Sequence, residues 1–293
     1  MNKISIIIPV ADDTWLDECL FSIADQDYEN KEVIVVPDKE RKGPSWARNK
    51  GLKEATGDWI MFLDADDYLA SKNALSFLLY YEYTGADIII GNYVEKRRNG
   101  VFPSRLWTHA REMVAWDIKL YMREYFKHHY KYPLLSHVWG RIYKRSAIGK
   151  EMFNEKLRNL EDVEFNIRTL KNVSKIKYVP FSTVVRRIHS KSQGTRCGEH
   201  SLEDYRNVWI TMLEYDRWWN LSNHCFVSMM IVALYRACRN KSWKFVKDAI
   251  EDPCVQFAIR EYNPTGDDAR LIPWLMRKRW VWPTMIAGYL YRR

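Results

Sequence analysis

A buried strand that ends in three carboxylates can be read from the segment Trp59-Ile-Met-Phe-Leu-Asp-Ala-Asp-Asp67. The run is apolar up to Leu63, follows Gly57, and is short enough for a strand buried inside a sheet. In open α/β folds, ligands bind at the edge formed by the carboxyl ends of the strands. Carboxylates crowded at that edge repel one another unless a cation lies among them, and their oxygens suit Mg²⁺ or Mn²⁺, which commonly also bind substrate phosphates. The segment therefore predicts a divalent metal bound together with a phosphorylated substrate.

The first hundred residues alternate between strand and helix patterns. Leu16, Leu20 and Ile23 share one face of an expected helix, and a second helix is expected to begin at Pro44 and end at Gly57. This alternation is typical of a mostly parallel, mixed sheet covered by helices on both faces. Apolar runs predict strands over Ile4–Val10, Lys31–Val36, Trp59–Leu63 and Ala86–Ile90.

The second half of the chain changes in character. The stretch from Glu95 to Lys131 has no clear pattern and is expected to be a functional loop region. After about residue 200 the pattern becomes helical, which predicts an α/β domain over residues 1–200 and a helical region over residues 201–293. The further elements expected are a helix from Glu161, strands over Ile176–Pro180 and Thr183–Ile188, and helices over Leu202–Trp219, Phe226–Cys238 and Trp243–Ile250.

Five segments occur in an order that resembles one known family. The chain is similar to the family 2 glycosyltransferases of the GT-A fold, and the resemblance covers roughly its first two-thirds. The fold class expected is therefore α/β of the GT-A type, with a helical C-terminal extension. The segments are Ile4-Ser-Ile-Ile-Ile-Pro-Val10, Glu32-Val-Ile-Val-Val36, Ala47-Arg-Asn-Lys-Gly-Leu52, Leu63-Asp-Ala-Asp-Asp67 and Leu160-Glu-Asp-Val-Glu-Phe165.

The resemblance implies roles for the acidic residues. In the family the second Asp of the D-x-D motif contacts the metal that bridges the donor phosphates, and the first contacts ribose or the metal. Asp64 and Asp66 match these positions, while Asp67 is expected to orient or cap. Asp162 matches the catalytic base of inverting members, with Glu161 beside it. The alternatives are a solvated acidic loop, and acids that only complement the dipole of a helix N-terminus.

The remaining expected contacts are with the donor. The family usually has two acids after its second strand, of which the second contacts uracil; here Pro37-Asp38 keeps only the second. Arg48 and Asn49 lie in the A-R-N segment, where a cation would help to hold diphosphate; an ion pair on a helix surface is the alternative. His189 lies in a segment that, in the family, can close over the donor, and it is expected to join the metal or the phosphates; a satisfied surface histidine is the alternative.

Composition limits the partners and the location. The net charge of +9 and the 13 tryptophans indicate an anionic partner, such as nucleic acid, a membrane surface or a phosphorylated ligand. The five cysteines lack C-x-x-C spacing, which predicts reduced thiols and no zinc site. The first apolar run ends early at Asp12-Asp13, so no secretory signal is expected. No run is expected to cross a bilayer, which needs roughly 20 apolar residues. These features predict a cytoplasmic protein.

The C-terminal tail combines basic and aromatic residues. Between Arg270 and Arg293 there are six basic residues and no acids, interleaved with Trp274, Trp280 and Trp282. This composition predicts contact with an anionic membrane surface, peripheral at the inner face of the cell membrane. A helical cap with a solvated basic face is the alternative. Stacking aromatics and cations also bind single-stranded RNA, but nothing else resembles an RNA-binding module, so no nucleic acid is expected.

Together these patterns predict an inverting glycosyltransferase with Mn²⁺ or Mg²⁺ as cofactor. It would move a sugar from a nucleotide-sugar donor, expected to be a UDP-sugar, to a hydroxyl of a glycan or lipid-linked glycan. The resemblance implies a setting in bacterial surface polysaccharide synthesis. A sugar nucleotidyltransferase is one alternative, but Pro9-Val-Ala-Asp-Asp13 is not its Gly-rich phosphate loop. A non-catalytic sugar-nucleotide binder or membrane scaffold is the other alternative. The loss of an acid at Pro37 favours it, whereas the presence of Asp64, Asp66 and Asp162 argues against it.

Overall fold

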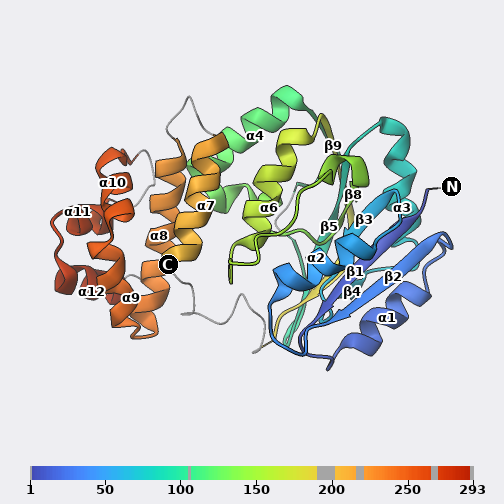
Figure 1. Cartoon of the computed structure of the whole chain (residues 1–293), viewed down its shortest axis with the longest axis horizontal. Coiled ribbons are helices and arrows are strands. Elements are labelled where there is room, and N and C mark those ends of the chain that lie inside the picture. The colour runs from blue at the N-terminus through green and yellow to red at the C-terminus, as the bar shows by residue number, and fades with distance from the viewer. Residues whose placement is uncertain (1, 105–106, 190–201, 216–220, 265–269, 291–293) are drawn as a thin grey trace. The chain divides into compact units, whose positions relative to one another are not determined.

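The computed structural model describes residues 2–104, 107–189, 202–215, 221–264 and 270–290 (Figure 1). Contacts divide the chain into two compact units. The first comprises Met1–Leu120, Leu134–Glu155 and Glu161–Ser192, and the second comprises Tyr121–Pro133, Lys156–Leu160 and Gln193–Arg293. The domain boundary predicted near residue 200 falls within residues 190–201, outside the described residues, and stays a prediction.

The first unit is built on a sheet with helices on both faces. Its helices are α1 (Leu16–Ala24), α2 (Pro44–Glu54), α3 (Ala74–Tyr80), α5 (Arg145–Ile148) and α6 (Glu161–Thr169), and α4 (Ala115–His128) begins in it. Its strands are β1 (Ile4–Val10), β2 (Lys31–Pro37), β3 (Trp59–Phe62), β4 (Tyr68–Leu69), β5 (Ile88–Arg97), β6 (Gly100–Pro103), β7 (Arg111–Val114), β8 (Arg141–Lys144) and β9 (Lys175–Arg187).

The sheet is mixed, and its longer strands share one direction. The strand order is β2-β1-β3-β8-β5-β9-β4, with β6 paired to β5 and β7 to β9. Strands β1, β2 and β3 pair in parallel, as do β5 and β9. Because β8 is antiparallel to both β3 and β5, these two sets point the same way, and only the short strands β4, β6, β7 and β8 run against them. The expected α/β class with a mostly parallel mixed sheet is confirmed.

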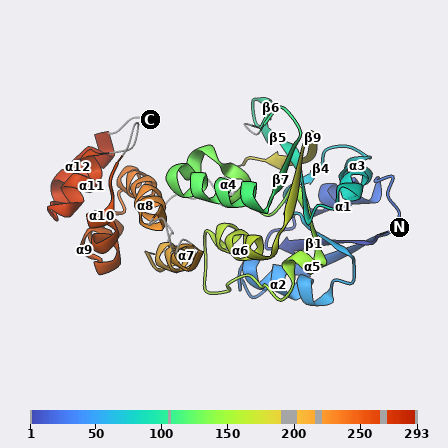
Figure 2. The ribbon, with the colours of Figure 1, turned by 90° about the horizontal axis from the view of Figure 1, so that it is seen from above.

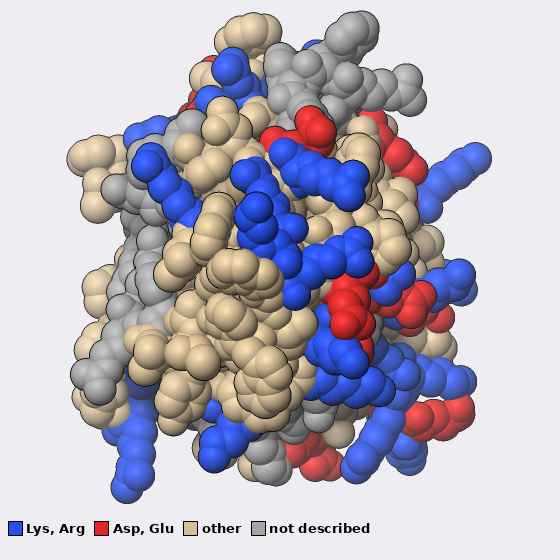
Figure 3. Space-filling view, turned by 90° about the vertical axis from the view of Figure 1, so that its left-hand side faces the viewer, with Lys and Arg blue, Asp and Glu red and all other residues tan. Residues whose placement is uncertain are grey.

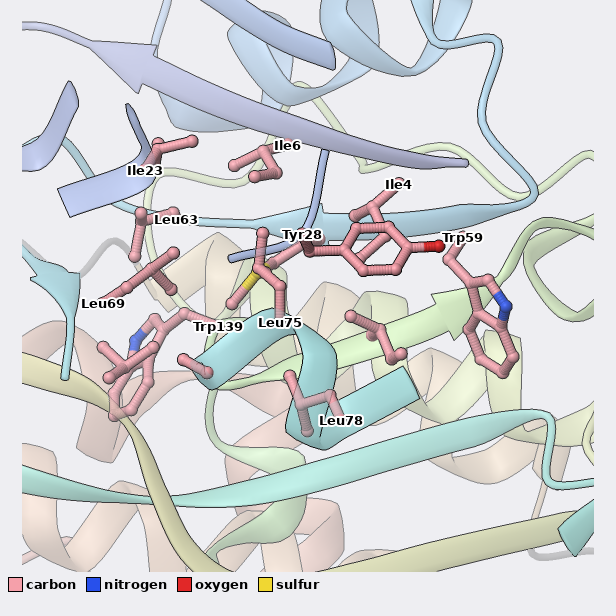
Figure 4. Close-up of a cluster of buried hydrophobic side chains, with 14 of the residues drawn as sticks. Ile4, Ile6, Ile23, Tyr28, Trp59, Leu63, Leu69, Leu75, Leu78 and Trp139 are labelled. Carbon is pink, nitrogen blue, oxygen red and sulfur yellow. The ribbon is translucent and has the colours of Figure 1, made fainter. Parts of the chain in front are cut away.

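The two faces of β1 explain the layering seen in Figure 2. Successive side chains of a strand point to opposite faces. Ile4, Ile6 and Ile8 belong to a buried cluster that α1 and α3 complete, several members of which are labelled in Figure 4. Ile7 points the other way, where a Cβ on Gly51 of α2 would lie 2.3 Å from Ile7 Cγ2. Glycine at this position therefore lets α2 lie close against the strand.

Several predicted boundaries need correction. The second helix ends at Glu54 and not at Gly57. Gly57 instead allows close approach to β1, since a Cβ there would lie 2.7 Å from the Ser5 backbone nitrogen. The two strands expected over 176–188 form the single strand β9, because its pairing with β5 shifts register beside Asn92 and so continues past Pro180.

The region from Glu95 to Lys131 is more ordered than the sequence predicted. It contains the end of β5, strands β6 and β7, and helix α4. All four residues of β6 and three of the four in β7 are exposed. These strands therefore lack the apolar alternation from which a strand is recognised in a sequence.

The second unit is helical, as expected. Helix α8 (Leu221–Arg239) is long and apolar enough to cross a membrane by length and composition, with a mean hydropathy of 1.2, whereas no such run was expected. However, 67% of that window is buried inside the protein, as in the core helix of a globular unit. The helices described here are α7 (Leu202–Tyr215), α8 (Leu221–Arg239), α9 (Trp243–Glu251), α10 (Pro253–Glu261), α11 (Leu271–Arg277) and α12 (Val281–Leu290).

Candidate active site

The turn after β3 gathers three carboxylates. One oxygen from each of Asp64, Asp66 and Asp67 lies within 4.8 Å of the others. The buried strand β3 delivers the turn to the carboxyl edge of the sheet, and the Asp67 N–H donates to Asp64 O at 3.0 Å, which closes it. Sequence reasoning assigned metal binding to Asp64 and Asp66 and gave Asp67 an orienting role. The structure places all three together, and the position of Asp67 directly after Asp66 is the sequence signal for the third carboxylate.

Electrostatics at this turn favour a bound cation. Burial raises the pKa of Asp66 and of Asp67, and repulsion from the neighbouring carboxylates raises both further. Burial and the same three acids raise the pKa of the Cys19 thiol to about 12. Crowded carboxylates with raised pKa values are groups whose negative charge is only partly compensated by their neighbours. The hard oxygen donors present here therefore fit Mg²⁺ or Mn²⁺.

The end of β9 is fastened to the same turn. His189, which was expected to join the metal or the phosphates, has its Nε2 atom 2.9 Å from Asp66 Oδ2. Arg187, which sequence reasoning did not single out, donates its backbone N–H to Asp67 Oδ1 at 2.7 Å and its Nε to Asp66 O at 3.1 Å. Its guanidinium also lies 3.9 Å from the ring centroid of Trp15. These contacts hold the β9 end beside the acidic turn.

Arg48 lies at the centre of the site. Its side chain is 4% exposed and reaches three carboxylates from the middle of α2. Nη2 donates to Asp64 Oδ1 at 2.9 Å, while Nη1 donates to Asp162 Oδ1 at 2.9 Å and to Glu161 Oε1 at 3.2 Å. The helix-surface ion pair considered from the sequence is therefore wrong. Arg48 is a buried bridge between the turn after β3 and the start of α6.

The two acids at the start of α6 form the second half of the site. Helix α6 begins at Glu161, as predicted. Burial raises the pKa of Glu161 to about 7, with the Asp162 charge adding to the rise and Arg48 opposing it. Burial likewise raises the pKa of Asp162, against the pull of Arg48. Asp162 is the more exposed of the two, at 16% against 8% for their side chains. An acid with a raised pKa is suited to accept a proton near neutral pH.

Asp38 and Asn49 organise the loops around this centre. Asp38 is buried after β2 and accepts the backbone N–H groups of Lys42 at 2.8 Å and Gly43 at 2.7 Å, which shapes the entry to α2. Asn49 exchanges two hydrogen bonds with the backbone of Phe153, at 2.7 and 2.9 Å, and donates to Glu155. Both were expected to contact the nucleotide. The bonds in the structure give them a part in fixing the neighbouring backbone.

Comparisons with known proteins find similarity to glycosyltransferases. Residues 35–152 match the family model described as glycosyl transferase family 2. The glycosyltransferase GlyA of Streptococcus pneumoniae serotype 4 is 27% identical over 243 residues, which cover 72% of this chain and 35% of GlyA. The GalNAc(5)-diNAcBac-PP-undecaprenol beta-1,3-glucosyltransferase of Campylobacter jejuni is 30% identical over 127 residues, covering 34% of this chain and 41% of that protein. The chain thus spans about a third to two fifths of the length of these relatives.

A solved structure shows the same fold. Staphylococcus aureus TarS (residues 1–349, in complex with UDP-GlcNAc) superposes with a TM-score of 0.67 at 17% identity, covering 98% of this chain and 90% of that one. The likeness shows that the chain has an α/β fold of the GT-A type. Residues 35–152, which carry Arg48 and the acidic turn after β3, are thus similar to the family 2 glycosyltransferases.

Proposed function

We propose that this protein is an inverting glycosyltransferase that moves a sugar from a UDP-sugar donor to a hydroxyl of a glycan or lipid-linked glycan during bacterial surface polysaccharide synthesis. One observation carries the proposal: Arg48 joins the acidic turn after β3 to the acid pair that opens α6. Glycosyl transfer needs a site for the leaving diphosphate and a base for the acceptor hydroxyl. The acidic turn would hold the metal that binds the diphosphate, and the acid pair of α6 would supply the base, with the buried Arg48 side chain joining the two.

Asp162 is the proposed base. It would take the proton of the acceptor hydroxyl while the hydroxyl oxygen bonds to the anomeric carbon and the bond from that carbon to the diphosphate oxygen breaks. Attack opposite the leaving group inverts the configuration, so an α-linked donor gives a β-linked product. Glu161 is more buried and would position Arg48, which in turn holds the Asp162 carboxylate.

Asp64, Asp66, Asp67 and His189 would hold the divalent ion, Mn²⁺ or Mg²⁺. A metal at this place stabilises the charge that develops on the departing nucleoside diphosphate. The crowding and raised pKa values of Asp66 and Asp67 support this assignment.

The donor is proposed to lie along the carboxyl edge near Asp38 and Asp64. Asp38 follows β2 at the position that contacts uracil in the resembling family, and Arg48 and Asn49 shape the same edge from α2. The UDP-GlcNAc complex belongs to TarS, and its fold likeness supports a nucleotide-sugar donor here.

The acceptor is proposed to be membrane-linked. The Campylobacter relative is named for an undecaprenol-linked saccharide, which supports a lipid-linked acceptor for this chain as well. Because such an acceptor is confined to a bilayer, the enzyme would act at a membrane surface, and we propose the cytoplasmic, inner face of the cell membrane.

Donor hydrolysis and binding across a panel of UDP-, GDP- and CMP-sugars, with Mn²⁺ and with EDTA, test the proposal. We expect metal-dependent hydrolysis of one UDP-sugar, loss of metal-dependent binding in Asp66→Ala, and binding without turnover in Asp162→Asn. Asp25→Asn is the matched control, because Asp25 is an exposed acid at the end of α1 and should leave both properties unchanged.

Other results would contradict the proposal in distinct ways. Nucleotide-sugar binding with neither hydrolysis nor transfer would favour a scaffold. Pyrophosphate release from a nucleoside triphosphate and a sugar phosphate would favour a nucleotidyltransferase.

A further inference from the structure

Helix α12 exposes four large apolar or aromatic side chains and buries Thr284, Met285 and Gly288. Trp282, Ile286, Tyr289 and Leu290 are 75%, 58%, 55% and 69% exposed, and their spacing places them on one helical face. The buried positions include Gly288, where an added Cβ would lie 2.7 Å from Cys238 Sγ of α8. Close packing on α8 therefore fixes which face of α12 points outward.

The exposed apolar surface continues onto α11 and onto Trp280, which follows that helix. Trp274 and Trp280 are 46% and 48% exposed, and their rings meet edge to face with centroids 5.5 Å apart. Leu271 at the start of α11 is 59% exposed. Together with the outward residues of α12, these side chains form what we call the α11–α12 face.

Positive charge accompanies this face. Arg270, Lys278 and Arg279 are exposed, and residues 270–290 contain no acid. Arg277 has a structural role, since its guanidinium donates to the backbone carbonyls of Ile259 and Tyr262 at the end of α10. Figure 3 shows the side of the molecule that bears these helices, with lysine and arginine side chains beside a broad uncharged area.

We infer that the α11–α12 face docks on the surface of an anionic lipid bilayer. Tryptophan and tyrosine rings favour the boundary between headgroups and acyl chains, and Ile286 and Leu290 lose water when they enter it. Lysine and arginine at the same depth are attracted to anionic headgroups. The inference extends the proposed membrane-linked acceptor by naming the surface that would bring the enzyme to it.

Charge and composition argue against the other occupants. A second copy of the chain would bring Lys278 and Arg279 close to identical cations, which repel. A single-stranded nucleic acid would stack on the aromatic rings but would leave the aliphatic Ile286 and Leu290 without a partner.

Vesicle co-sedimentation of the full chain tests the inference, with phosphatidylcholine alone and with increasing phosphatidylglycerol. We expect binding that requires the anionic lipid and weakens with salt. Lys278→Gln combined with Arg279→Gln should weaken binding on the order of 25-fold, because each surface-near basic residue contributes a factor of about five. Trp282→Ser combined with Ile286→Ser should reduce it at least as much.

Matched controls distinguish binding through the α11–α12 face from non-specific adsorption to vesicles. Trp116→Ser with Leu120→Ser changes an exposed Trp and aliphatic pair at the same spacing on α4, where the acids Asp117 and Glu124 are close in sequence. Lys53→Gln with Lys150→Gln removes two exposed charges elsewhere. Both controls should bind as the unchanged chain does, and circular dichroism should report intact folding for every variant.

The contrary results are equally specific. The inference would be overturned if the chain bound neutral vesicles equally well, or if both α11–α12 variants bound vesicles as the unchanged chain does. It would also be overturned if the chain bound RNA but not vesicles, or if it formed a dimer that only the double variant of Trp282 and Ile286 lost. Donor hydrolysis measured without vesicles in the same preparations reports on the proposed activity separately. A failure of docking can therefore be told apart from a failure of the catalytic proposal.

Discussion

Arg48 donates from Nη1 to Asp162 at 2.9 Å, although 114 residues separate the two in the chain. The same guanidinium also reaches Asp64 and Glu161, so one cation faces three carboxylates in a buried environment. Burial alone would neutralise acids held so closely. Arg48 is therefore the residue that allows two separate acidic groups to share one site.

Replacing Arg48 tests this arrangement directly. Arg48→Met leaves three carboxylates without their buried partner, and we expect it to lower the free energy of unfolding by about 3–5 kcal/mol at pH 7.5. Arg48→Lys keeps a charge but loses the planar fork, so it should cost less. Urea denaturation measures both, with Arg98→Met as the exposed control.

The loss in Arg48→Met should also depend on pH. Without the Arg48 charge, which opposes the rise, the pKa values of Glu161 and Asp162 in the folded state increase further, so protonation at pH 5.5 relieves their repulsion. The difference in unfolding free energy between Arg48→Met and the unchanged chain should therefore shrink from pH 7.5 to pH 5.5. A difference that stays constant over this range contradicts the assigned charges.

Replacing Asp162 should lower kcat far more than replacing Glu161, the other acid at the start of α6. Asp162→Asn removes the proposed base, and we expect kcat to fall by about 10²–10⁴-fold with little change in the Kd of the donor. Glu161→Gln keeps an oxygen that can accept from Arg48, so its kcat should fall by only about tenfold. Single-turnover kinetics and calorimetric donor titration measure the two quantities. Equal losses in both variants would assign the base to neither residue alone.

Glu32 of β2 accepts hydrogen bonds from Ser5 of β1 and from neighbouring residues, and their contribution to stability depends on pH. Burial acts to raise its pKa, but hydrogen bonds from Lys3, Ser5 and Thr56 outweigh this and lower it to about 2. A depressed carboxyl pKa stabilises the fold above the unfolded-state value of 4.5, and this stability is lost as the pH falls from about 4.5 towards 2. Discounted for partial solvent exposure, the contribution is on the order of 1–2 kcal/mol.

Glu32→Gln removes that titration. Its unfolding free energy should lie below that of the unchanged chain at pH 6, and the two values should converge as the pH approaches 2.5. Urea midpoints across this range provide the measurement. Curves that stay parallel down to pH 2.5 would show that Glu32 does not titrate differently in the folded protein.

The sequence allowed the strands around the site to be predicted more readily than its contacts. Strands β1, β2 and β3 follow from apolar runs, and the start of α6 follows from its acidic first turn. The partners of Arg48 could not be predicted, because α6 lies more than 110 residues further along the chain and meets α2 only through tertiary packing. The contribution of Arg187 was missed for the same reason, since its backbone N–H meets Asp67 across 120 residues.

Gly51 connects the packing of α2 to the position of Arg48, one turn earlier on the same helix. Gly51→Ala would place Cβ 2.3 Å from the stiff side chain of Ile7, so the helix must move away from β1. We expect a loss of about 1–3 kcal/mol in unfolding free energy and a fall in kcat, because the guanidinium moves with the helix.

The contact between Gly51 and Ile7 can be tested by combining the two replacements. Ile7→Ala alone should lower the unfolding free energy by about 2–5 kcal/mol through the cavity it leaves. In Gly51→Ala with Ile7→Ala the new methyl group enters that cavity, so the combined loss should be at least 1 kcal/mol smaller than the sum. Additive losses in urea denaturation would mean that α2 and β1 do not meet at this contact.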